Sequence, residues 1–539
     1  MRRTVWTTSL CLVTAAALAQ STPPELARIE VAFADMNDAL GAIGLIDSGY
    51  TASYGGRDRA TWDRMLDARR SEVRDGLGRL PIGALSDQDA RAATLMRSSV
   101  EPTDASAGLA PVARCADARQ ANLGYTALSE ALYACFDELG NNVEFEGGKL
   151  TRVAAFDSLA QLAEPERRKS LFLAFTPLWQ SINGAGEAGS PYRRLIRMAA
   201  AEARQKGSGI DAAARTLGVS SAVVESWLTQ TLDTWRQVSG DESIEPWDYR
   251  YAGGAAERAL GELVSRDALG SLSARYYSDL GADLKAMGVI YDLEPRPGKA
   301  PLAYADFVSR GRYVDGKWRA TVARVSANYS RGGLGVLNEL VHEDGHVVHM
   351  MAVRTRPAFM DLGDSLFVEA FADVTSWNTY QPAWQRKYLG RGVPEPQSLR
   401  SLYSGVMLDV AWALFELRML RDPAADPNAV WTEITSRYLR VVPHPELAWW
   451  AVRGQLVGSP GYMVNYGLGA VLTADLRGRI RDQLGPFEAG DRRWYGWITE
   501  RLLRSGQERE TADLLLEFLG RPVSPDALIA DLRRIADPH

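Results

Sequence analysis

The stretch HEDGHVVH at residues 342–349 contains three of the five histidines of this 539-residue chain. It has the pattern His-Glu-x-x-His, with one more histidine three residues later. On a helix, His342 and His346 stand one turn apart on one face, so both imidazoles can reach one cation at about 2.0–2.1 Å. Glu343 lies beside them and can accept a proton from water on that cation. With histidine this scarce, the pattern predicts a catalytic zinc site rather than a chance match.

The remaining sequence is mainly helical in pattern, with apolar residues at three- and four-residue spacing. Before the metal motif, we predict helices at residues 24–44, 58–75, 88–97, 117–138, 152–163, 165–180, 190–204, 211–217, 221–237 and 255–287. In contrast, the runs 306–308, 312–314 and 318–325 are extended in character, and a turn is expected at 315–317. A small antiparallel sheet is therefore expected. The metal-binding helix should begin near Val336 and continue until Pro357 ends it.

The N-terminus has the pattern of an export signal. Arg2 and Arg3 precede an apolar stretch from Val5 to Leu18, and small residues at positions 17 and 19 form a cleavage pattern. We interpret residues 1–19 as a signal peptide rather than a membrane anchor, because the apolar stretch is short and interrupted by hydroxyl residues. The protein is then expected to be exported, to the periplasm or outside the cell.

Composition limits the partners of the chain. Two of its 61 basic residues lie in the predicted signal peptide, which leaves 59 basic and 67 acidic residues and a formal charge of −8. This negative charge argues against a nucleic-acid partner. No later segment has an uncharged run long enough to span a bilayer. Cys115 and Cys135 remain after signal removal, and in an oxidising compartment they can form a disulfide, with two free thiols as the alternative.

A third metal ligand must come from downstream, because two histidines leave a zinc site one protein ligand short. Residues 365–374 have the pattern of a second helix, on which Glu369 and Asp373 lie one turn apart. We predict Glu369 as the ligand and Asp373 as the acceptor for the other ring N–H of a ligand histidine. Their helix is largely apolar, where carboxylates without partners are costly. Asp361 and Asp364 in the preceding loop are competing ligands.

Several motifs in the same order resemble the thimet oligopeptidase family of zinc peptidases, whose helix carries His-Glu-Phe-Gly-His-x-x-His and whose third ligand is a Glu in a Val-Glu-Ala-like context. Residues 292–299, DLEPRPGK, are similar to that family's Asp-Leu-x-x-Arg-x-Gly-Lys segment, and Asn328-Tyr329 stands where the family has Asn-Phe at the end of a strand. The Glu369-Ala-x-x-Asp373 pattern is closer to angiotensin-converting enzyme and thermolysin. The resemblance covers roughly residues 275–480.

The resemblance implies a two-lobed, helical, gluzincin-type metallopeptidase fold with a deep central channel and one Zn²⁺ at its floor. Such channels admit short peptides and exclude folded proteins. Residues 20–250 would then form one wall of the channel and residues 251–539 the catalytic region. We expect a monomer. Asn328 is the candidate for binding the substrate, with the strand that ends there pairing with the peptide backbone along an edge.

This chain also departs from the family. These peptidases bind the oxyanion with tyrosines and an upstream histidine, and the Gly-Tyr-x-x-x-Tyr part of that segment resembles Gly461 to Tyr466. Tyr462 and Tyr466 are therefore the candidate oxyanion donors. The position of the histidine is Val457, and that of a later tyrosine is Gly469. His444 lies too far back for a match.

Two residues of the histidine cluster remain open to interpretation. Asp344 replaces an apolar residue of the family, either as a solvent-facing change or as an electrostatic adjustment near the zinc. His349 is expected to have a structural or substrate-side role, since a fourth protein ligand would close the position that water needs.

The main hypothesis is an exported zinc peptidase that cleaves short peptides, with Glu343 as general base. The alternative is an exported peptide-binding protein that has the zinc site but little turnover, which the missing histidine and Gly469 favour. Lys299, Arg324 and Arg331 are the sequence candidates for binding a peptide's terminal carboxylate.

Overall fold

The computed structural model describes residues 22–100, 113–296, 299 and 303–536. The predicted signal peptide at 1–19 lies outside these residues. Within them, helices dominate and each sheet has only two or three strands, which confirms the mainly α fold with a small sheet. None of the helices in the described ranges combines the length and hydropathy that a membrane span needs.

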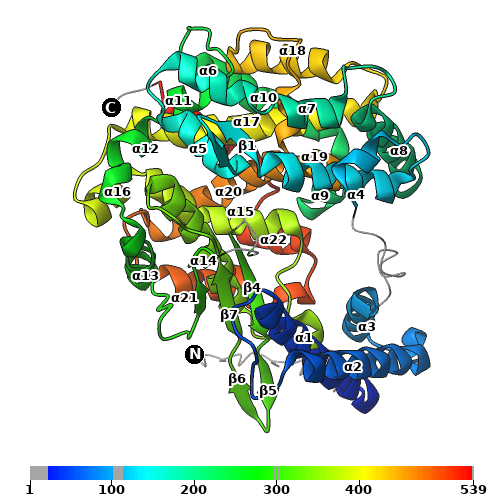
Figure 1. Cartoon of the computed structure of the whole chain (residues 1–539). Helices are drawn as coiled ribbons and strands as arrows, with labels where there is room; N and C mark the ends of the chain where they lie inside the picture. The colour runs from blue at the N-terminus through cyan, green and yellow to red at the C-terminus, as the bar shows by residue number, and fades with distance from the viewer. Residues whose placement is uncertain (1–21, 101–112, 297–298, 300–302, 537–539) are drawn as a thin grey trace, which may run out of the picture.

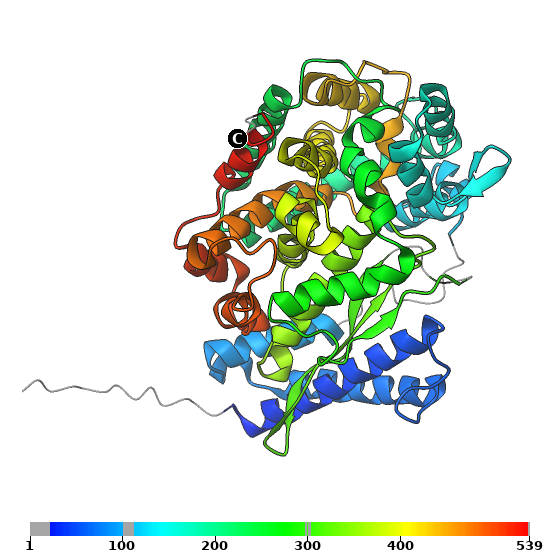
Figure 2. The same cartoon turned by 90° about the vertical axis from the view of Figure 1, so that its left-hand side faces the viewer.

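The first three helices are α1 (Pro24–Asp47), α2 (Arg59–Arg79) and α3 (Asp87–Val100). They share a hydrophobic cluster with Ala358 and Phe359. Figures 1 and 2 show these helices in blue at one end of the molecule, beside the strands. Helix α1 packs along β4 (Tyr304–Ser309) so closely that a Cβ on Gly41 would lie 2.2 Å from the carbonyl oxygen of Val308.

A second group of elements lies at the opposite end of the molecule (Figure 1). It combines helices from the first half of the chain with helices that follow the metal motif, and α10 packs against α17. Its elements are α4 (Tyr125–Cys135), β1 (Val143–Phe145), β2 (Gly148–Leu150), α5 (Arg152–Gln161), α6 (Pro165–Leu173), α7 (Thr176–Asn183), α8 (Pro191–Lys206), α9 (Gly209–Thr216), α10 (Val224–Val238), α11 (Tyr249–Gly253), α12 (Ala255–Leu260), α17 (Glu395–Arg421), α18 (Pro427–Leu439) and α19 (Gln455–Gly458). A disulfide joins Cys115 to Cys135 at the end of α4.

The remaining helices include α14, which carries the His-Glu-x-x-His motif. They are α13 (Leu269–Asp279), α14 (Leu334–Ala352), α15 (Ser365–Ser376), α16 (Pro382–Leu389), α20 (Met463–Leu484), α21 (Trp494–Ile498), α22 (Thr511–Leu519) and α23 (Asp526–Arg533). Helix α15 packs against both α14 and α20, and the Thr473 hydroxyl of α20 donates to the Ala370 carbonyl of α15 over 2.9 Å. The core of the molecule therefore holds α15 in place from two sides.

Two of the longer predicted helices are divided. Residues 165–180 form α6 and α7, because Pro177 lies in the first turn of a new helix, where a missing N–H is tolerated. Residues 255–287 form α12 and α13, with Ser265 extended between them at φ −69° and ψ 156°. Helix α14 ends at Ala352, before Pro357, because Val353 is extended.

The predicted strand 318–325 is also divided, into β6 (Lys317–Arg319) and β7 (Val322–Ser326). Strand β6 pairs with β5 (Arg312–Val314) in a hairpin, and its turn places Asp315 and Gly316 at φ 50° and 73°. Strand β7 lies between β3 (Ile290–Asp292), which is parallel to it, and β4, which is antiparallel. Both edges of β7 are thus already paired, and the expected edge pairing of a peptide with this strand is wrong.

Candidate metal centre

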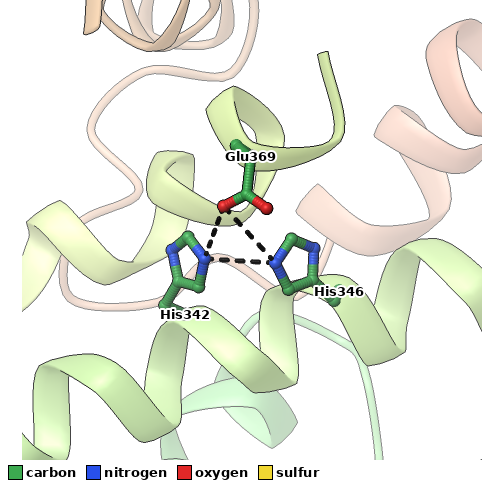
Figure 3. A group of neighbouring side chains, drawn as sticks. All are labelled: His342, His346 and Glu369. Atoms are coloured by element: carbon green, nitrogen blue, oxygen red, sulfur yellow. Dashed lines mark hydrogen bonds and ion pairs between the residues drawn. The ribbon is translucent and has the colours of Figure 1, made fainter. Parts of the chain in front are cut away.

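The two histidines of α14 point to one place. The Nε2 atoms of His342 and His346 lie 3.1 Å apart, and their rings are perpendicular at an interplanar angle of 89° (Figure 3). Residues one helical turn apart share a face, which is why this spacing brings both ring nitrogens together. The site therefore begins with two nitrogen ligands on one rigid helix.

Helix α15 supplies an oxygen to the same place. Oε2 of Glu369 lies 3.3 Å from Nε2 of His342 and 3.9 Å from Nε2 of His346 (Figure 3). The ligand atoms of these three residues all fall within 4.8 Å of one another, the only such group of metal-ligating side chains among the residues described. Two imidazoles and one carboxylate fit zinc, whose catalytic sites use three protein ligands and one open position.

Gly345 permits this arrangement. A Cβ at position 345 would lie 2.8 Å from Cα of Ala372 and 3.0 Å from its carbonyl oxygen. Helices α14 and α15 thus cross with almost no side chain between them at this point. Because the backbones approach so closely, the Glu369 carboxylate can reach the two histidines.

Asp373 lies one turn beyond Glu369 and faces His342. Its Oδ1 is 2.8 Å from Nδ1 of His342 and accepts a hydrogen bond of the same length from the Ser376 hydroxyl. A carboxylate at this position favours the tautomer whose Nε2 is free to ligate. Nδ1 of His346 is buried and has no such partner among the described residues. Only one of the two histidines is therefore oriented by a carboxylate.

The competing carboxylates face elsewhere. Asp361 forms an ion pair with Arg310 at 3.1 Å and accepts the backbone N–H of Leu362 at 2.8 Å. Asp364 precedes α15 and is exposed. Neither belongs to the group of three ligand atoms.

Glu343 is buried, and its Oε2 has no hydrogen-bond partner within the described part of the chain. Burial raises the pKa of Glu343 to about 7, and the charges of Glu339 and Glu369 act in the same direction. A carboxyl group with a pKa near neutrality can both accept and return a proton. The free Oε2 atom of Glu343 and its position next to His342 suit this proton transfer.

Asp344 is fully buried on another side of α14, so a solvent-facing role is wrong. Its carboxylate accepts hydrogen bonds from the Ser273 hydroxyl at 2.5 Å and the Tyr291 hydroxyl at 2.8 Å. Burial raises the pKa of Asp344 to about 7. The residue fixes α14 to α13 and β3.

His349 packs away from the three ligands. Its ring lies 5.4 Å from that of Phe367 and 5.0 Å from that of Phe371, measured between centroids. Burial lowers its pKa to about 3, so the ring is neutral at physiological pH. His349 therefore packs between α14 and α15 and has a structural role.

Tyr462 and Tyr466 lie together at the start of α20, with ring centroids 5.8 Å apart. The Tyr466 hydroxyl accepts a hydrogen bond from the Gln455 amide at 3.2 Å, which leaves its own proton available. Burial raises the pKa of both tyrosines, and the charge of Glu369 acts in the same direction. Their hydroxyls therefore stay protonated and lie within electrostatic reach of the metal ligand.

Within the described ranges, neither sequence position expected near these tyrosines is a histidine, and His444 is engaged elsewhere. Val457 and Gly469 are both buried. His444 is bound to Glu446 at 2.6 Å and Glu245 at 2.9 Å, and its ring packs against that of Trp247. A cation that lies near Tyr466 is Arg453, whose guanidinium carbon is 5.7 Å from the ring centroid. Sequence reasoning missed this residue, because no motif marks it.

Two cavities lie near the candidate site, one along α14 and the other at the start of α20. One of about 630 Å³ is lined by Asn328, Arg331, Val153 and by Val336 and Glu339 of α14. The other, of about 310 Å³, is lined by Tyr462, Tyr466, Gln455, Arg152 and also by Val153. Because Val153 borders both, the two cavities are neighbours along one wall.

The sequence candidates for binding a carboxylate are already engaged. Nζ of Lys299 is buried and donates to the carbonyl oxygens of Asp292 at 2.6 Å and Ala327 at 2.5 Å. Arg324 donates to the Gly44 carbonyl at 3.0 Å, and Arg331 forms an ion pair with Asp157.

No family model matches the chain, and the search of curated proteins found no match. Solved structures are similar along nearly its whole length. An M32 carboxypeptidase from Deinococcus radiodurans R1 has a TM-score of 0.60 at 15% identity, covering 95% of this chain and 97% of that one. Trypanosoma cruzi metallocarboxypeptidase 1 has 0.54 at 14% identity, with coverages of 95% and 99%. PZ peptidase A, solved with an inhibitor, has 0.55 at 14% identity, with coverages of 94% and 85%. At these identities the likeness establishes the fold.

Proposed function

We propose that this chain is an exported, zinc-dependent peptidase that hydrolyses short peptides. The observation that carries the proposal is the convergence of His342, His346 and Glu369 within 4.8 Å. Beside them lies Oε2 of Glu343, which has no hydrogen-bond partner among the described residues. The fold supports it, since the similar structures are named as carboxypeptidases or a peptidase. A disulfide is typical of proteins in oxidising compartments, which supports export.

The residues of the site divide the reaction between them. Zinc, when held by the three ligands, supplies Lewis-acid chemistry that acidifies water and polarises a carbonyl group. Glu343 takes a proton from the attacking water and returns it to the leaving amine. Tyr466 donates its hydroxyl proton in a hydrogen bond to the oxygen that becomes negative as the carbonyl carbon is attacked. Asp373 keeps the His342 ring in its ligating tautomer.

The deciding experiment compares the wild type with Glu343→Gln at equal zinc content, on a mixture of short peptides followed by mass spectrometry. Glutamine keeps the size of the side chain but cannot take the proton, so we expect the rate to fall by at least about 10³-fold while zinc binding persists. Asp364→Asn is the matched control, because it changes an exposed carboxylate near α15. Equal cleavage by Glu343→Gln would reject the role of Glu343.

Product masses also distinguish internal cleavage from release of C-terminal residues or dipeptides. Capture of peptides by the zinc-loaded wild type without any product would instead favour the binding protein, whose supporting observation is the buried Val457 in place of a histidine.

A further inference from the structure

Three arginines from distant parts of the chain lie near one another and near Tyr466. Arg152 is the first residue of α5, Arg250 lies in α11 and Arg453 follows the turn at residues 449–452. The guanidinium carbons of Arg152 and Arg250 lie over the same ring, that of Phe156, at 5.7 and 4.1 Å from its centroid. That of Arg453 lies 4.6 Å from the Trp412 ring centroid. Both rings border one small apolar pocket, together with Arg250.

The positive charge of this arginine cluster is poorly compensated. Asp409 forms an ion pair with Arg453, but Nε of Arg453 is buried and has no hydrogen-bond partner in the described part of the chain. Arg152 and Arg250 have no hydrogen bond or ion pair to any described residue; their contact is with the Phe156 ring. Among the described residues, Asp409 is the one carboxylate ion-paired with the three guanidinium groups, and Asp157 acts on Arg250 through its charge alone.

Arg168 shows how a buried arginine of this chain is compensated when protein partners surround it. Arg168 of α6 donates to Asp248 at 2.7 Å and to the carbonyls of Leu162 and Ala163 at 2.7 and 2.8 Å. A charge removed from water is costly unless it is paired. Half-buried arginines without protein partners are therefore expected where an anionic ligand completes the site.

Burial opposes the charges in the cluster. It lowers the pKa of Arg250 to about 10 and that of Arg453 to about 9, and the positive charge of Arg152 acts in the same direction on both. Arginine nevertheless stays protonated at neutral pH. The cluster is thus a concentrated positive charge in a partly desolvated position, and only about a fifth of the Arg453 side chain, 21%, is exposed.

The cluster lies next to the reacting groups. Arg152 lines the same cavity as Tyr462 and Tyr466. Arg453 faces the Tyr466 ring at 5.7 Å, and Tyr466 in turn senses the charge of Glu369. An anionic group bound by the arginines would therefore lie close to the peptide bond whose oxygen accepts the proposed hydrogen bond from Tyr466.

We propose that Arg152, Arg250 and Arg453 form an anion subsite that binds the acidic side chain of a peptide substrate, beside the bond that is cleaved. The choice of substrate class rests on the proposed peptidase function. Asp409 pairs with one of the three guanidinium groups and Asp157 is already paired with Arg331, so a lone terminal carboxylate would leave one guanidinium without an ion-pair partner. An acidic side chain together with a second carboxylate, from the terminus or an adjacent acidic residue, matches the remaining charge.

The test measures binding separately from turnover. A dye-labelled pentaalanine peptide carries one Glu at each position in turn, a second set carries Gln there, and both sets are made with free and amidated C-termini. Fluorescence anisotropy with the full-length, zinc-loaded Glu343→Gln protein gives the affinities. We expect at least one position where Glu binds about 10-fold more tightly than Gln, the size typical of a charge-assisted pair.

Variants assign that preference to the cluster. Arg152→Gln and Arg250→Gln should each remove most of the preference for Glu while changing the affinity for Gln peptides less than about twofold. Arg57→Gln is the matched control, because this exposed arginine also lies over an aromatic ring, Trp62, at 5.0 Å. Arg152→Glu should bind a Lys peptide more tightly than the unchanged protein does, a gain that misfolding cannot produce.

Equal affinities for Glu and Gln peptides at every position would overturn the proposal. So would a preference that depends only on the free C-terminus, since the cluster would then bind the terminal carboxylate alone. Charge-dependent binding in a wild type that cleaves nothing would reject the peptidase function but not the subsite. Cleavage at equal rates for Glu and Gln peptides, without charge-dependent binding, would reject the subsite but not the peptidase function.

Discussion

Nδ1 of His342 lies 2.8 Å from Oδ1 of Asp373, on the side of the ring opposite Glu369. This contact links α14 to α15 through the ligand itself, so Asp373 sets both the tautomer and the orientation of the ring. We predict that Asp373→Ala weakens zinc affinity by about 10–100-fold, as measured by competition with a chelator. Asp364→Ala, an exposed carboxylate before the same helix, should leave the affinity unchanged. Equal zinc affinity in both variants would contradict the role of Asp373.

The close crossing at Gly345 gives a second prediction. Gly345→Ala places a methyl group against the Ala372 backbone, and backbone cannot move aside as a flexible side chain can. We expect a loss of about 1–3 kcal/mol in unfolding free energy and weaker zinc binding, because α15 must shift away from the histidines. Gly335→Ala on the same helix meets no atom within 4 Å and should be neutral or stabilising. Urea unfolding and zinc titration of both variants test this.

The helical fold and the meeting of His342, His346 and Glu369 could be predicted from the sequence because they depend largely on local spacing. The helical period placed His342 and His346 on one face, and the apolar surroundings of Glu369 indicated a carboxylate with a partner. The burial of Asp344 could not be predicted, since Ser273 and Tyr291 reach it from other segments. The arginine cluster was missed for the same reason: its members come from three separate segments, and none belongs to a motif.

Tyr466 has its hydroxyl oxygen occupied by the Gln455 amide and its proton free. We predict that Tyr466→Phe lowers kcat by about 10²–10³-fold with little change in KM, because the lost hydrogen bond forms mainly in the transition state. Tyr313→Phe is the control, since Tyr313 is 69% exposed on a hairpin. Steady-state kinetics on one good peptide substrate measures both. A rise in KM alone would indicate that Tyr466 binds the substrate and does not stabilise the oxyanion.

Glu416 contacts the start of α20, the helix that carries Tyr466, and is expected to make the unfolding free energy depend on pH. This α17 carboxyl group is buried and accepts the backbone N–H of Met463 at 2.7 Å. Burial raises its pKa from 4.5 to about 8, so the folded protein holds this proton over a range in which the unfolded chain has lost it. The contribution of Glu416 to the free energy of unfolding is then fully present below about pH 4.5 and is lost as the pH rises toward 8.

We therefore predict that the free energy of unfolding of the wild type falls by a few kcal/mol between pH 5 and 8 through this group. Glu416→Gln keeps an acceptor for the Met463 N–H but cannot ionise, so its stability should change less over the same range. Glu130→Gln, on an exposed face of α4, should retain the wild-type slope. Chemical denaturation at half-unit pH steps compares the three proteins. If Glu416→Gln and the wild type have the same slope, Glu416 is ionised in the folded protein, and the two backbone donors at Gly461 and Met463 must outweigh its burial.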